Sequence, residues 1–250
     1  MEQWLASISS TELMALAVGS LLIGISKGGI KGLTSITVLL MADAFGAKLS
    51  TGIVLILLCM GDIMAISYYR RNVVWSYVWK LLPAAIVGIL VGVWIGDQLD
   101  GEAFKRILAW TVILGILLII WQEYQQLSAA LMGHPVVTNI AGFIGGFTTM
   151  VGNAAGPVMS IYLLATRLKK NEFIGTAAWF FLFINFFKIP FHIWVWETIS
   201  WPTIKLNLLA LPVIAIGFFI GVKLVKYIPE KAFRYFIIVV TLIGAVKLLF

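Results

Sequence analysis

Six predominantly apolar runs, each roughly 20 residues long, constrain the fold of this chain more than any other feature of its sequence. A helical run of that length crosses the ~30 Å hydrocarbon core of a bilayer, because an α-helix rises about 1.5 Å per residue. The predicted spans cover residues 49–69, 76–96, 104–122, 173–195, 203–223 and 232–250. We therefore expect an all-α, polytopic membrane protein.

Composition supports this class and excludes others. Hydrophobic residues make up 61% of the chain and charged residues only 12%, whereas charged residues form about 25% of ordinary soluble domains. The net charge is +7, but the basic residues lie in short clusters between apolar runs. This distribution is typical of a membrane protein's loops and argues against a nucleic-acid partner. The single cysteine, Cys59, has no partner for a disulfide or a metal site.

Two further apolar regions are broken. Leu13–Ile25 is separated from Leu33–Ala42, and Val136–Val151 from Val158–Leu168, by glycine-rich polar sequence. Each piece contains fewer residues than a normal span, so we expect each pair to form a broken or re-entrant hairpin. Polar backbone of this kind is tolerated at membrane depth only where protein buries it or a cavity accepts it.

The chain also contains an internal repeat. Five residues of the first half recur 129 positions later: Pro83, Gly88, Gly92, Phe104 and Gly115 match Pro212, Gly217, Gly221, Phe233 and Gly244. We predict two repeats, residues 1–125 and 126–250, that together form one integral membrane domain. Each repeat is a broken hairpin followed by three transmembrane helices. Two series of glycines spaced four residues apart, one beginning at Gly88 and the other at Gly217, are expected to allow close helix packing.

Each hairpin returns to the side from which it enters, so each half makes an odd number of crossings and the second half is predicted to be inverted. Basic residues gather on one predicted side, including Arg70, Arg71, Arg167, Lys169 and Lys170. By the positive-inside rule this side is cytoplasmic. Both termini are therefore predicted to face the periplasm.

The two hairpin tips are candidate anion sites. A helix that begins inside the membrane points its free N–H groups and the positive end of its dipole inward. Glycines permit close approach of a ligand, while hydroxyl, amide and lysine side chains add contacts. The alternative is that the glycines serve packing alone. The candidate substrate-binding residues are Ser26, Lys27, Gly28, Gly29, Lys31, Gly32, Thr148, Thr149, Gly152, Asn153, Ala154, Gly156, Asn185 and Lys188.

Three polar residues interrupt predicted spans. Asp62 and Asn185 occupy equivalent places in the two halves, which suggests a shared site. Asp62 either carries a coupling proton, neutralises Lys27 or makes a structural hydrogen bond. Lys188 is a ligand contact or extends toward the interface. His192 and Trp196, near a span end, are expected at the membrane interface.

The sequence lacks the residues that a serine hydrolase, an ATP-driven pump or a zinc protease requires. Gly24-Ile-Ser-Lys-Gly28 matches the G-x-S-x-G pattern of serine hydrolases, but no strand precedes it and no histidine has a plausible partner context. The sequence has no ATP-binding P-loop and no zinc-binding H-E-x-x-H motif. We expect no catalytic residues, cofactor or metal. The expected partners are a small anion and membrane lipid, with a homodimer as a further option.

Three segments carry a family resemblance: Gly24-Ile-Ser-Lys-Gly-Gly29, Gly152-Asn-Ala-Ala-Gly-Pro-Val-Met159 and Lys170-Asn-Glu-Phe-Ile-Gly-Thr-Ala-Ala-Trp179. Together they resemble the sulfite exporter TauE/SafE family, over nearly the whole chain. The resemblance implies a secondary transporter for sulfite, sulfoacetate or related organosulfur acids in the bacterial cytoplasmic membrane. An anion channel with the same site, and a membrane scaffold without transport activity, remain alternatives.

Overall fold

A computed structural model describes residues 8–30, 33–99, 103, 106–107, 110, 134–229, 232, 235 and 239. In this part of the chain every regular element is helical, which agrees with the predicted all-α class. The helices are α2 (Ser10–Lys27), α3 (Leu33–Phe45), α4 (Ala47–Tyr69), α5 (Trp75–Asp97), α8 (Pro135–Gly152), α9 (Gly156–Ala165), α10 (Lys170–Trp194) and α11 (Trp201–Tyr227), with a short 3-10 turn at Arg70–Asn72.

Six of these helices are long and apolar enough to cross a membrane: α2, α4, α5, α8, α10 and α11. This confirms a polytopic membrane protein. Helices α4, α5, α10 and α11 correspond to four of the predicted spans. The other two predicted spans, residues 104–122 and 232–250, lie largely outside the described residues.

The expectation that every hairpin arm is shorter than a span is wrong for the first arms, because α2 and α8 each contain 18 residues. Both helices begin earlier than the apolar pattern indicates. Ser9 caps α2 through a capping box with Glu12, which satisfies N–H and hydroxyl groups at the helix start. Pro135 opens α8 behind the capping side chain of His134. The second arms are short, with 13 residues in α3 and 10 in α9.

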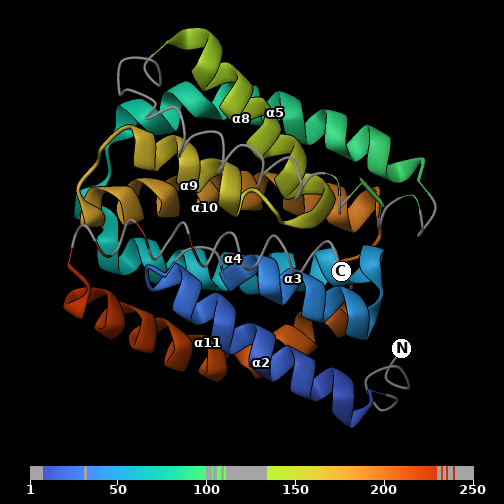
Figure 1. Cartoon of the computed structure of the whole chain (residues 1–250). Helices are drawn as coiled ribbons and strands as arrows, with labels where there is room; N and C mark the ends of the chain where they lie inside the picture. The colour runs from blue at the N-terminus through green and yellow to red at the C-terminus, as the bar shows by residue number, and fades with distance from the viewer. Residues whose placement is uncertain are drawn as a thin grey trace.

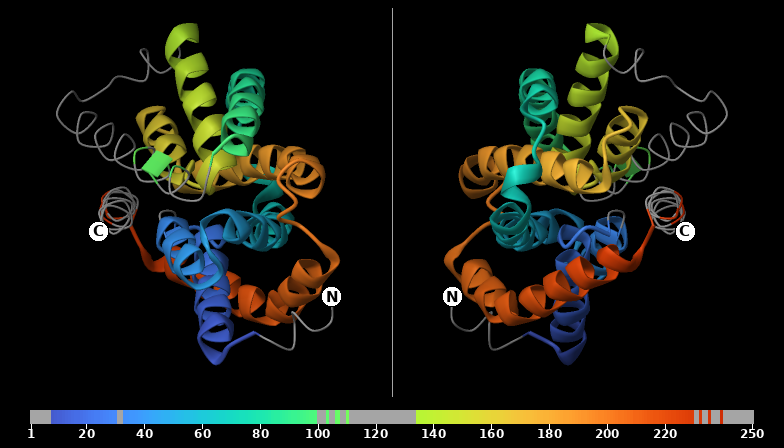
Figure 2. Two further views of the ribbon diagram at one scale, coloured as in Figure 1. Left: turned by 90° about the vertical axis from the view of Figure 1, so that its right-hand side faces the viewer. Right: turned by 90° about the vertical axis from the view of Figure 1, so that its left-hand side faces the viewer.

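Three of the most extensive helix pairs join a helix of the first half of the chain to one of the second half. Helix α5 packs on α8, α11 packs on α2, and α4 packs on α10. The first two pairs form opposite outer faces of the bundle (Figures 1 and 2). A Cβ atom at Gly88 would lie 2.1 Å from the carbonyl oxygen of Phe143, and one at Gly217 would lie 2.3 Å from that of Leu21. The packing role expected for these two glycines is therefore confirmed.

Equivalent helices of the two halves run in opposite directions in Figure 1: α2 begins at the right-hand end of the bundle and α8 at the left. This relationship agrees with inverted halves. The division into repeats 1–125 and 126–250 nevertheless stays a prediction, because the last predicted span of each half lies largely outside the described residues.

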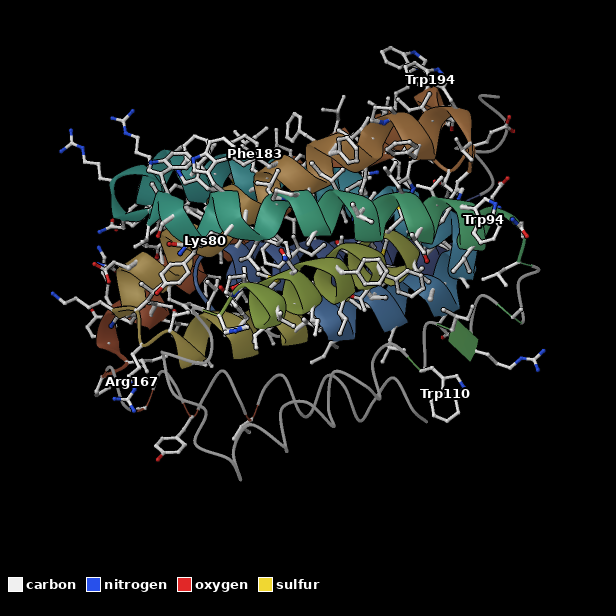
Figure 3. The ribbon with its side chains drawn as sticks, turned by 90° about the horizontal axis from the view of Figure 1, so that it is seen from above. Lys80, Trp94, Trp110, Arg167, Phe183 and Trp194 are labelled. Carbon is white, nitrogen blue, oxygen red and sulfur yellow. The ribbon has the colours of Figure 1, made fainter. Side chains whose placement is uncertain are left out.

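Several side chains mark the two ends of the bundle. In Figure 3, Lys80 and Arg167 lie toward one end, and Trp94, Trp110 and Trp194 toward the other. The basic cluster at Arg70 and Arg71 follows the C-terminal end of α4. Which end faces the cytoplasm stays a prediction from the charge pattern.

Candidate functional site

A small cavity of about 30 Å³ lies between the two chain interruptions. Its polar lining comes from both: Ser26, Lys27 and Thr34 from the first, and Thr149, Asn153, Gly156 and Ser160 from the second. Apolar residues of α4, α9 and α10 complete the wall: Leu58, Met159, Leu163, Phe173, Ala177 and Phe181. The cavity thus brings together segments that lie more than a hundred residues apart in the sequence.

The first interruption ends α2 beside this cavity. Gly28 donates its backbone N–H to the carbonyl oxygen of Gly24 as the last helical bond. Gly29 then adopts a φ of +135°, a conformation that side chains other than glycine rarely accept. The hydroxyl groups of Ser26 and Thr34 lie 3.0 Å apart, so a hydrogen bond joins the end of α2 to the first turn of α3.

The second interruption is a left-handed cap. Asn153 follows α8 with a φ of 53° and donates its backbone N–H to the carbonyl oxygen of Thr149. Asparagine is the residue after glycine that best tolerates this conformation. Helix α9 then begins at Gly156 with Pro157 in its first turn, where proline is favoured because its missing N–H would have no partner. The first turns of α3 and α9 therefore both adjoin the cavity.

Lys27 forms a buried ion pair. Its Nζ donates to Oδ1 of Asp62 at 2.5 Å, and the two side chains are 4% and 0% exposed. The second carboxylate oxygen, Oδ2, accepts a hydrogen bond of 2.7 Å from Nδ2 of Asn185. Nζ of Lys27 also lies 4.8 Å from the ring centre of Phe181, within the range of a cation–π contact. Of the roles open to Asp62, the contacts show two: neutralisation of Lys27 and a hydrogen bond to a neighbouring helix.

A second buried lysine, Lys188, hydrogen-bonds to residues of the second interruption. Nζ of Lys188 donates to the carbonyl oxygen of Thr149 at 2.9 Å, to Thr149 Oγ1 at 3.0 Å and to Asn153 Oδ1 at 2.7 Å. The side chain is fully buried. Asn153 in turn donates from Nδ2 to the carbonyl oxygen of Thr51 at 3.0 Å. Lys188 therefore orders two cavity-lining residues and does not extend toward the interface.

The candidate residues divide into four groups. Ser26, Lys27, Thr149, Asn153 and Gly156 line the cavity. Asp62 and Lys188 lie behind this lining and bind it through hydrogen bonds, and Asn185 binds Asp62. Lys31 and Gly32 lie outside the described residues.

The remaining candidates make contacts within the protein. A Cβ at Gly28 would lie 2.4 Å from the carbonyl oxygen of Phe218, so this glycine allows α2 to approach α11. A Cβ at Gly29 would lie 2.7 Å from Val225 Cγ2. The Thr148 hydroxyl bonds to the carbonyl oxygen of Gly145. Gly152 and Ala154 are buried. The packing alternative therefore describes Gly28 better than ligand contact does.

Sequence reasoning missed the apolar part of the lining and also Thr34, Ser160 and Phe181, and it misplaced His192 and Trp196. Thr34 and Ser160 line the cavity, one in the first turn of α3 and one four residues after Gly156. Their helical spacing from the tips is the signal that points to them. Phe181 adds the aromatic contact to Lys27. His192 and Trp196 are not interfacial anchors, because they are 0% and 4% exposed. His192 Nδ1 lies 2.7 Å from Thr198 Oγ1.

Comparisons with known proteins agree with the membrane fold. The family model described as "Sulfite exporter TauE/SafE" matches residues 11–248. A curated relative from Comamonas testosteroni, "Probable inner membrane transporter protein TsaS", is 30% identical over 171 residues, which cover 66% of this chain and 67% of the relative. No solved structure matches the chain.

Proposed function

Because this chain belongs to the sulfite exporter TauE/SafE family, we propose that it is a secondary transporter of sulfur-containing anions in the bacterial cytoplasmic membrane. The observation that carries this proposal is the cavity between the two interruptions. One lysine, several hydroxyl groups and the first turns of two helices converge there. This combination of groups suits an anion.

Each of these groups favours negative charge for a stated reason. The first turns of α3 and α9 have backbone N–H groups without intrahelical partners, and the helix dipole is positive at that end. Lys27 lines the cavity with a cationic nitrogen. The hydroxyl groups of Ser26, Thr34 and Ser160 are able to donate to oxyanion oxygens.

The cavity volume favours a compact substrate. A volume of about 30 Å³ exceeds the 10–15 Å³ that one water molecule requires, but only modestly. Sulfite, with a single sulfur centre and three oxygens, suits this conformation better than sulfoacetate. A larger organosulfur acid requires the two interruptions to move apart.

Transport by alternating access follows from two halves that pack against each other around one site. The sequence has no P-loop for ATP, so the energy comes from an ion or solute gradient. Asp62 is the proposed coupling group, because it is the carboxylate that holds Lys27 at the cavity. An anion channel and a non-transporting scaffold are the competing functions.

Uptake of radiolabelled sulfite into proteoliposomes tests the proposal. A carrier gives saturable uptake and counterflow, in which internal unlabelled sulfite accelerates entry of label. A channel gives neither saturation at low concentration nor counterflow, and a scaffold gives no uptake. Lys27→Met should lower uptake, whereas the exposed Lys223→Met, near the end of α11, should not.

A further inference from the structure

Three charged groups of the described residues lie around the cavity, and their charges do not cancel. Lys27 and Asp62 form an ion pair. The acceptors of Lys188 are a carbonyl, a hydroxyl and an amide oxygen, all uncharged. Among the described residues no carboxylate lies within salt-bridge distance of Lys188 Nζ. The cluster therefore consists of two cations and one anion.

The hydrogen bonds of Lys188 identify its form and its role. A charged ammonium has three N–H donors, and Nζ donates to three oxygens. No donor is left for a ligand, so Lys188 acts on the cavity through its charge and through the two residues that it orders. Both of those residues, Thr149 and Asn153, line the cavity.

We propose that the unpaired charge of Lys188 makes this site selective for singly charged oxyanions over doubly charged ones. This inference rests on the proposed function and specifies its substrate class. A buried charge is costly unless an opposite charge compensates it. A monoanion in the cavity brings the cluster of Lys27, Asp62 and Lys188 to neutrality. A dianion leaves one uncompensated negative charge at low dielectric.

The class includes hydrogen sulfite and monosulfonates, as opposed to sulfite dianion and sulfate. Lys188 is a positioning residue in this scheme and makes no direct contact with substrate. Lys27 lines the cavity and supplies direct contact. The charge balance, rather than the number of donors, therefore determines which anion is preferred.

Two tetrahedral probes of similar size separate charge from shape. Methanesulfonate carries one negative charge and sulfate two, and neither titrates near neutral pH. Calorimetric titration of the purified full-length protein in detergent, at constant ionic strength, measures the two dissociation constants. The wild type should bind methanesulfonate tighter than sulfate by roughly tenfold or more.

Variants then change the charge of the cluster one step at a time. Lys188→Gln brings the net charge of the cluster to zero, so it should weaken binding of both probes and leave sulfate the weaker of the two. Asp62→Asn, which leaves two uncompensated lysines, should shift the preference toward sulfate. The double variant Lys27→Met/Asp62→Asn removes the ion pair as a unit and retains Lys188. It should bind both probes more weakly than the wild type but keep the preference for methanesulfonate.

The outcomes distinguish this inference from the proposed function. If the wild type binds neither of the two probes and does not bind sulfite, both the proposed function and the inference are overturned. Binding of sulfite with no preference between the probes, or probe affinities unchanged in Lys188→Gln, would overturn the inference alone. If Lys188→Gln fails to fold, the shift toward sulfate expected for Asp62→Asn and the preference for methanesulfonate retained in the double variant still decide the matter.

Discussion

Asn185 donates a hydrogen bond of 2.7 Å from Nδ2 to Oδ2 of Asp62, so two residues that the sequence repeat predicts to be equivalent contact each other directly. The other carboxylate oxygen of Asp62 accepts from Lys27. Helices α2, α4 and α10 are thereby joined by one buried carboxylate. Any change at Asp62 therefore affects both the packing of these helices and the charge at the cavity.

We predict that Asp62→Ala destabilises the protein by about 3–5 kcal/mol, because it leaves the ammonium of Lys27 buried without a counter-ion. The double variant Lys27→Met/Asp62→Leu should recover most of this loss, since it replaces the pair with apolar groups. Chemical unfolding in detergent micelles measures both. Equal destabilisation of the single and double variants would show that the ion pair is not the source of the effect.

Much of the architecture could be predicted from the sequence because lipid imposes a simple rule on apolar length. Helices α4, α5, α10 and α11 begin and end within a few residues of the predicted spans. The apolar pattern underestimates the length of the first arm of each hairpin. The length of α2 depends on the cap formed by Ser9 and Glu12, which lies outside the apolar pattern. Polar capping residues extend a helix beyond its hydrophobic run.

The candidate site was predictable in composition but not in its contacts. The pairing of Lys27 with Asp62 was one of several open alternatives, and the structure shows that pair. The role of Gly28 depends on the distance between α2 and α11, which no local pattern specifies. Likewise, burial of His192 depends on how residues 195–200 fold back toward α10, through its carbonyl bonds to Thr198 and Ile199.

The orientation of the chain is a separate prediction. The charge pattern places both termini in the periplasm. A C-terminal alkaline phosphatase fusion should be active in cells, and a C-terminal green fluorescent protein fusion should be dark, because the latter does not fold after export in unfolded form. If the fluorescent protein fusion is bright and the phosphatase fusion inactive, the predicted orientation is wrong and the termini face the cytoplasm. The packing of the helices does not depend on this result.

Asp62→Asn should also flatten the pH dependence of transport, because the amide keeps the shape of the side chain but does not exchange a proton. Initial rates of methanesulfonate uptake into proteoliposomes, measured across a range of external pH, check this, because methanesulfonate itself does not titrate near neutral pH. Asp43→Asn, which changes an exposed carboxylate of α3, is the matched control and should retain the wild-type profile. A profile that persists in Asp62→Asn would assign proton coupling to another group.

Gly156 offers the most direct test of the cavity itself. It lines the cavity, and a Cβ atom built on it meets no other atom within 4 Å. Its φ also lies outside the left-handed region, so Gly156→Ala and Gly156→Val should fold without strain and fill the space progressively. We expect Gly156→Val to weaken sulfite binding by roughly tenfold or more while the unfolding temperature stays near that of the wild type.

Gly88→Val is the contrasting variant, because its Cβ would lie 2.1 Å from the carbonyl oxygen of Phe143 and force α5 away from α8. That substitution should lower the unfolding temperature sharply, although Gly88 is remote from the cavity lining. Thermal unfolding and calorimetric titration on both variants separate a blocked site from a damaged fold. Undiminished binding in a well-folded Gly156→Val protein would place the anion elsewhere in the bundle.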